Sequence, residues 1–173
     1  MDLIKRFNDY FNKLEEALNT PSEIDWSKEN NNLIGFFDIN DIKYKIECLK
    51  QIGNNYAYLF SFYDTELNDW SFRLTNKGLD SFKVLSTIKE GLNYVFKNLN
   101  PNSVIFSAID NSDSRKRIYL TFCETFCKEN SLLFLDKGTN DRKIYLLYKD
   151  NLSSVDKEEI MESLIKVIEI GKD

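Results

Sequence analysis

The sequence predicts a single α/β domain in which helices flank a mixed, mostly antiparallel sheet. Alternating polar and apolar residues over 42–48 are typical of a strand with one wet face. Apolar residues three and four positions apart over 80–98 predict an amphipathic helix, and the almost continuous apolar run over 104–109 predicts a central strand covered on both faces. With 173 residues, 42% of them hydrophobic, the chain is long enough to bury one core.

The first part of the chain is expected to form a helix followed by an antiparallel meander. Apolar side chains at helical spacing predict an amphipathic helix over 2–19, within an N-terminal segment 1–20. Thr20-Pro21 ends this helix, because the residue before a proline avoids the helical region. Trp26 is expected to anchor the polar segment 22–32 to the body of the domain. The expected strands of the meander are 33–38, 42–48, 56–62 and 70–74.

Helices and strands alternate in the second half of the chain. Asp80 or Ser81 is expected to cap the helix over 80–98, and a second helix is expected to start at Asp113 or Ser114. The remaining expected elements are strands 132–135 and 144–148 around a turn at 138–141, and a C-terminal helix within 153–171 that Ser153 or Ser154 caps and Gly171 ends. The core is therefore expected over 33–149, with no internal repeat and no domain boundary.

The chain contains no histidine, which removes several kinds of chemistry. Ser-His-Asp and Cys-His catalysis, histidine-bound zinc and a histidine general base are all excluded. The three cysteines are an odd number, which favours free thiols in a reducing, cytoplasmic setting. Cys123 and Cys127 lie one helical turn apart and are expected to be buried thiols. No acidic triad stands at metal-binding spacing, so no metal is expected.

The net charge of −5 is spread along the chain, which argues against bulk binding to nucleic acid or to an anionic membrane. No apolar stretch approaches the roughly 20 residues that a membrane span needs. The N-terminus leads into an amphipathic segment, not into a signal peptide. A local basic patch at Arg115, Lys116 and Arg117 leaves a nucleotide or nucleic-acid binder as a third hypothesis.

From residue 33 to residue 148, the order of elements resembles that of GCN5-related N-acetyltransferases. Those folds have a meander, a long helix below a pyrophosphate-binding turn, a strand, a helix and a closing hairpin. The resemblance implies that Gly78, Asp80 and Ser81, at the start of the helix over 80–98, lie where coenzyme A would bind. Backbone N–H groups and a helix N-terminus favour anions. The alternative is an ordinary strand-to-helix turn with a capping Asp80, because Gly78 is the only glycine in the turn.

The same resemblance gives Tyr119 a role as an acid. In many acetyltransferases a tyrosine on the helix after the fifth strand protonates the leaving thiolate of coenzyme A. Tyr119 stands in a comparable place, about two helical turns after Asn111. A phenol with a pKa of about 10 can act as an acid toward a thiolate. The alternative is a tyrosine whose ring packs against the sheet.

Polar residues gather where the strand over 104–109 gives way to the next helix. Asn111, Ser114 and Arg115 belong to this segment, and in open α/β sheets such an edge is where ligands usually bind. Arg115 in a first helical turn is placed unfavourably toward the helix dipole, which indicates a partner. That partner is either a phosphate or a carboxylate such as Asp110 or Asp113, and a structural ion pair is the simpler hypothesis.

Four short motifs in the middle of the chain resemble a family of small uncharacterised proteins encoded by tailed phages. The motifs are Thr75-Asn76-Lys77-Gly78, Asp80-Ser81-Phe82-Lys83-Val84-Leu85-Ser86-Thr87-Ile88, Ile105-Phe106-Ser107-Ala108 and Ser114-Arg115-Lys116-Arg117-Ile118-Tyr119. This resemblance implies a phage or mobile-element origin, with a host cytoplasmic location, and supplies no established activity.

The leading hypothesis is an accessory protein that binds another protein, inhibits a host system and uses no cofactor. The aromatic-rich meander fits it if both faces of that sheet carry aromatic residues, because one face must be core and the outer one would then be available to a partner. Its aromatic residues are Tyr56, Tyr58, Phe60, Phe62, Trp70 and Phe72. Core packing is the alternative explanation for most of these residues. The alternative is an active N-acetyltransferase that uses acetyl-CoA, with Gly78 near the pyrophosphate and Tyr119 as the acid. Homo-oligomerisation is left open.

Overall fold

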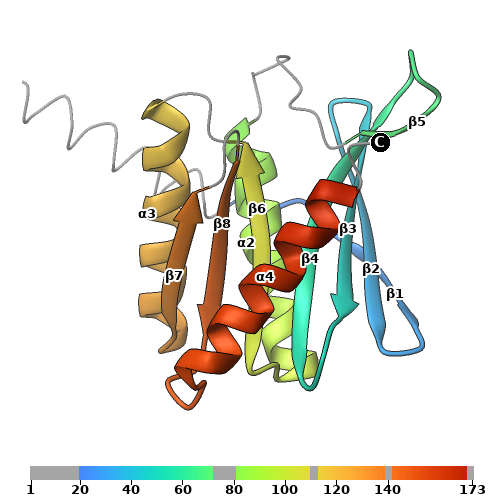
Figure 1. The fold of residues 1–173 in the computed structure, drawn as a ribbon. Helices are drawn as coiled ribbons and strands as arrows, with labels where there is room; N and C mark the ends of the chain where they lie inside the picture. Colours follow the sequence, from blue (N-terminus) through green and yellow to red (C-terminus); the bar gives the residue numbers. More distant parts are fainter. Residues whose placement is uncertain (1–19, 72–80, 110–112, 139–141, 171–173) are drawn as a thin grey trace, which may run out of the picture. The chain divides into compact units, whose positions relative to one another are not determined.

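The computed structural model describes residues 20–71, 81–109, 113–138 and 142–170 (Figure 1). The strands and helices in these ranges are β1 (Asp25–Glu29), β2 (Asn32–Ile39), β3 (Ile42–Lys50), β4 (Asn55–Asp64), β5 (Asp69–Ser71), α2 (Ser81–Leu99), β6 (Ser103–Ile109), α3 (Asp113–Asn130), β7 (Leu133–Gly138), β8 (Arg142–Tyr148) and α4 (Ser154–Ile170). The helix expected over 2–19 lies outside them.

The strands form an eight-stranded sheet in the order β1-β2-β3-β4-β6-β8-β7, with β5 paired to β4. The β4–β6 pair is parallel, and β6–β8, β7–β8, β4–β5 and β1–β2 are antiparallel. A single mixed, mostly antiparallel α/β fold is therefore confirmed, as is the order of meander, helix, strand, helix and closing hairpin. In the part of the chain that the structure describes, no helix is long and apolar enough to cross a membrane.

By its contacts the chain divides into two compact units. The first comprises Met1–Glu47 and Phe60–Leu99, and the second comprises Cys48–Leu59 and Asn100–Asp173. Both β3 and β4 pass from one unit into the other along the chain, so the division is not a boundary between successive segments.

Strand β1 is a correction to the sequence analysis, which expected no strand in the polar segment 22–32. It pairs antiparallel with β2, and Trp26 lies opposite Gly35. The Trp26 ring stacks on Tyr94 of α2, with centroids 4.6 Å apart, which confirms the expected anchor. A Cβ at residue 35 would stand 2.9 Å from the Trp26 ring and 2.7 Å from Ile24, so glycine is required there. The strand escaped prediction because an edge strand needs few apolar residues.

The core of the first unit lies between α2 and one face of the sheet. Because Trp26 and Gly35 face α2, the residues of β2 that alternate with Gly35, such as Phe37, face α2 as well. Phe37 stacks on Tyr44 and on Phe60, with centroids 5.1 and 6.3 Å away. The opposite face of β2 carries Phe36, which is 43% exposed.

The second unit has helices on both faces of its strands (Figure 1). On one face, Phe122 of α3 meets Phe106 of β6, whose ring also stacks on Tyr145 of β8. On the other face α4 closes a second cluster, whose members are Ala57, Ile105, Ile144, Leu146, Tyr148, Leu152, Ile160, Met161 and Leu164. The prediction of a central strand over 104–109 is thereby confirmed for β6.

The start of α4 also follows the prediction. Ser153 Oγ accepts a hydrogen bond from Asp156 N at 3.1 Å and donates one to Asp156 Oδ2 at 2.6 Å. This reciprocal pair satisfies an N–H group that has no partner within the helix. Ser153, one of the two residues expected to cap this helix, is therefore its N-cap.

Candidate functional site

The parallel pair β4–β6 is short and firmly held at one end. Its register joins Asn55–Ala57 to Ser103–Ile105. Three hydrogen bonds secure the start: Asn102 N to Asn54 O (2.8 Å), Asn54 Nδ2 to Asn100 O (2.9 Å) and Ser103 Oγ to Asn55 Oδ1 (2.8 Å). Lys149 Nζ adds a hydrogen bond of 2.6 Å to Asn100 Oδ1. These polar side chains therefore fasten the N-terminal ends of the two strands.

Beyond Ala57 and Ile105 the two strands continue, but their register with each other ends. In the second unit, β4 runs on through Tyr58 and Leu59, while β6 runs on to Ile109 and stays paired with β8 over all seven of its residues. We call this point the β4–β6 divergence.

Tyr119 lies on α3 and is half-buried. Its ring centroid is 6.0 Å from that of Tyr145, which is almost fully buried and stacks on Phe106 at 5.2 Å. The ring of Tyr119 therefore packs toward the sheet, on the face that α3 covers.

The other predicted site residues are described only in part. Helix α2 begins at Ser81, which is exposed. Ser114 and Arg115 fall in the first turn of α3, which begins at Asp113, and their side chains are not described. Gly78, Asp80 and Asn111 lie outside the described residues. Their assembly into one site therefore remains a prediction.

Burial raises the pKa of three thiols and of the Tyr58 phenol in the second unit. Burial raises the pKa of Cys48 and of Cys127 to about 12, and raises that of Cys123 as well. Burial, together with the nearby Cys48, raises the pKa of Tyr58. All three thiols are free and buried, which confirms the prediction for Cys123 and Cys127. Among the described residues, no group of three potential ligands could hold a metal ion.

Raising the pH from about 9 to about 12 is expected to destabilise the protein through these thiols. A thiol with an ordinary pKa of 9.0 loses its proton in the unfolded chain first, whereas folded Cys48 keeps its proton up to about pH 12. Stability is thus fully present below pH 9 and falls as the pH rises toward 12. Urea unfolding followed by circular dichroism across this range measures it. The Cys48→Ala variant should show a weaker pH dependence, and an equal dependence would contradict the assignment.

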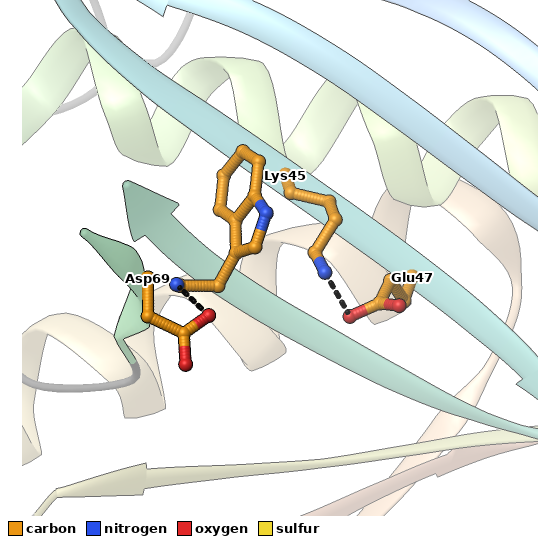
Figure 2. A network of polar contacts seen from close by, with 4 residues as sticks. Lys45, Glu47 and Asp69 are labelled. Atoms are coloured by element: carbon orange, nitrogen blue, oxygen red, sulfur yellow. Dashed lines mark hydrogen bonds and ion pairs between the residues drawn. The ribbon is translucent and has the colours of Figure 1, made fainter. Parts of the chain in front are cut away.

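Three aromatic residues, Phe36, Tyr63 and Trp70, form what we call the aromatic patch of the first unit. Trp70 lies 5.9 Å from Phe36 and 5.6 Å from Tyr63, between ring centroids. Lys45 Nζ stands 4.7 Å from the centroid of the Trp70 ring and 3.1 Å from Glu47 Oε2 (Figure 2). Cation–π attraction and this ion pair both hold the patch in place.

The turn before Trp70 is ordered by its own side chains. Tyr63 Oη donates a hydrogen bond of 2.6 Å to Asn68 Oδ1. Trp70 N donates one of 2.7 Å to Asp69 Oδ1 (Figure 2). The sequence analysis named Trp70 but missed Phe36. The signal was present, because in a strand the neighbours Phe36 and Phe37 must face opposite sides of the sheet.

Comparisons with known proteins give fold-level similarities only. No protein-family model matches the chain, and no curated protein matches it. The chain is similar to the N-acetyltransferase PseH of Campylobacter jejuni (TM-score 0.38, 10% identity, 85% of this chain and 80% of that one). It is also similar to a probable acetyltransferase (TM-score 0.42, 12% identity, 71% of this chain and 65% of that one). A third similar structure is a spermidine N-acetyltransferase SpeG variant of Vibrio cholerae (TM-score 0.39, 11% identity, 84% of this chain and 73% of that one). The expected acetyltransferase-like order of elements depends on the order and pairing of this chain's own strands, and not on these similarities.

Proposed function

We propose that the protein is a non-catalytic accessory protein that binds another protein through the aromatic patch. The observation that carries this proposal is the exposure of Phe36: 43% of the residue stays in contact with solvent although its ring packs on Trp70. A polar residue would be compatible with the fold at this outward-facing position of β2, as Asp38 two residues later shows. An aromatic ring that the fold leaves exposed is available to a partner.

The aromatic patch has the composition of a binding hot spot, the small group of residues that contributes most of the binding energy of an interface. Tyrosine and tryptophan are enriched among the few residues that contribute most binding energy. The Trp70 ring is already held by Lys45, Phe36 and Tyr63, so a partner would lose little rotamer freedom in binding it. Lys45 and Glu47 provide a polar rim beside the rings.

A phage or mobile-element origin is part of the same proposal. Its support is the resemblance of the segments around Gly78, Phe106 and Tyr119 to proteins of tailed phages. On this account the protein works in the host cytoplasm, where it binds and inhibits a host protein.

An acetyl-CoA-dependent N-acetyltransferase is the second candidate, and the β4–β6 divergence favours it. A V-shaped opening between central strands is what such an enzyme needs, and the β4–β6 register ends after three residues of each strand. Acetyl-CoA would supply the acetyl group, which passes from its sulfur to an acceptor amine. The phenol of Tyr119 would give its proton to the thiolate that leaves, and the turn at Gly78 would face the pyrophosphate.

Capture of a binding protein from an extract of a bacterial host tests the leading proposal. The immobilised full chain should retain a partner that its Trp70→Ala variant binds at least about 30-fold more weakly, since a central aromatic residue contributes about 2 kcal/mol or more. Phe36→Ser should weaken the same partner. Leu67→Ser is the matched control, because Leu67 is 59% exposed but lies outside the patch. Equal retention by all four proteins would contradict the proposal.

A further inference from the structure

Strand β7 is an edge of the sheet with apolar side chains in solvent. It is the last strand in the sheet order and pairs with β8 on one side; no described strand pairs with its other side. Leu133 and Leu135 are 45% and 41% exposed, although the residues opposite them in β8, Tyr148 and Leu146, are buried. The outward backbone groups of β7 and these two leucines therefore form an unpaired, apolar edge.

Strand β1, at the other end of the sheet order, carries charged side chains that protect an edge strand from pairing with another chain. In β1, Asp25, Lys28 and Glu29 are all exposed. In β7 the run Leu133-Phe134-Leu135 comes first, and Asp136 is already held by Lys143 at 2.5 Å. Only the second half of β7 carries charge, so its first half is open to pairing.

We propose that two copies of the chain pair antiparallel through β7, about a twofold axis at Phe134. Side chains of directly opposed residues in an antiparallel pair point to the same face of the sheet. In a symmetric pair of β7 strands, this is possible only if one residue lies opposite its own copy, with the twofold axis between the two. With the axis at Phe134, Leu133 lies opposite Leu135 of the partner subunit, and the two Phe134 residues face each other. All three cross-strand pairs are then apolar, which is the favourable case.

The charges of β7 select this register over its neighbours. An axis at Leu135 would place two charged residues opposite apolar ones, Asp136 opposite Phe134 of the partner subunit and Lys137 opposite the partner's Leu133. An axis at Phe134 does so only once, because Asp136 lies opposite Leu132 of the partner subunit. An axis at Asp136 would place two carboxylates face to face, which is unfavourable. With the axis at Phe134, Lys137 lies opposite Ser131 of the partner subunit, directly after the end of α3 at Asn130. A cation beside the C-terminus of a helix is stabilising, so the charges are complementary.

Sedimentation equilibrium of the full chain at about 10 to 500 µM tests the proposal, because a small interface gives a weak dimer. The wild-type protein should form a reversible dimer. Leu135→Lys should raise the dissociation constant at least about tenfold, a change of roughly 1.4 kcal/mol. Leu67→Lys places the same charge on another exposed leucine and should leave the dimer unchanged. A wild-type protein that stays monomeric, or equal effects of the two lysines, would overturn the proposal.

Disulfide trapping tests the register separately. Phe134→Cys places two thiols opposite each other at the axis, within reach of a disulfide, so mild oxidation should give a covalent dimer. Lys137→Cys should give much less, because its opposite residue is Ser131. The native thiols of Cys48, Cys123 and Cys127 are buried and leave this readout clean. Preferential trapping at residue 137 would refute the register, whatever partner the aromatic patch binds.

Discussion

Tyr145→Ala will lower the free energy of unfolding by about 3–5 kcal/mol, the range seen when a large buried ring is removed. Tyr145 is 1% exposed, in the middle of the α3-covered face of the second unit. Its ring stacks on Phe106 at 5.2 Å and contacts Tyr119 at 6.0 Å. Alanine would leave a cavity that β6 and α3 cannot close without moving. Urea unfolding followed by circular dichroism measures the loss.

The matched control is Tyr145→Phe, which keeps the ring and removes only the hydroxyl. We expect this variant to lose no more than about 1.5 kcal/mol, the contribution of a typical hydrogen bond. A loss equal to that of Tyr145→Ala would show that the hydroxyl, and not the ring stack, stabilises this face. Little loss in either variant would contradict the packing of β8 against α3.

Phe37→Ala will destabilise the protein by about 3–5 kcal/mol, whereas Phe36→Ala, one residue earlier, will cost less than about 1 kcal/mol. Phe37 is 4% exposed and stacks on Tyr44 and Phe60, but Phe36 is 43% exposed on the opposite face of β2. Thermal or urea unfolding of both variants under identical conditions gives the comparison.

This pair of variants also separates stability from binding. If Phe36 serves a partner, its loss should weaken capture of that partner while the unfolding free energy stays close to the wild-type value. Similar destabilisation by the two substitutions would mean that Phe36 is part of the core, and the aromatic patch would then lose its functional interpretation.

The sequence predicted the parts of the fold whose periodicity is strong. Strand β3 alternates from Ile42 onward, and α2 repeats its apolar residues at helical spacing. Strand β6 is apolar at five of its seven residues, because helices of its own unit cover both faces. Strand β1 was missed because its pairing with β2 and the stacking of Trp26 on Tyr94 join it to other elements, while the segment itself carries little apolar alternation. Such a contact between residues distant in sequence leaves no periodic signal.

The candidate site was less predictable than the fold. Burial of Cys123 and Cys127 followed from their helical spacing, and the structure confirms it. The roles given to Tyr119, Ser81, Ser114 and Arg115 depend on chemistry that spacing does not determine. The sequence indicated that Phe36 and Phe37 face opposite sides of a strand, but only the register of β2 shows which of the two is exposed.

Binding of acetyl-CoA distinguishes the proposed protein-binding function from acetyl transfer. Titration calorimetry of the purified full chain with acetyl-CoA measures this binding most directly, with Gly78→Glu and Tyr119→Phe as controls. We expect no heat of binding even at millimolar acetyl-CoA. Micromolar binding that is lost in Gly78→Glu would contradict the proposed function and favour the acetyltransferase candidate, whose acceptor amine would then be sought.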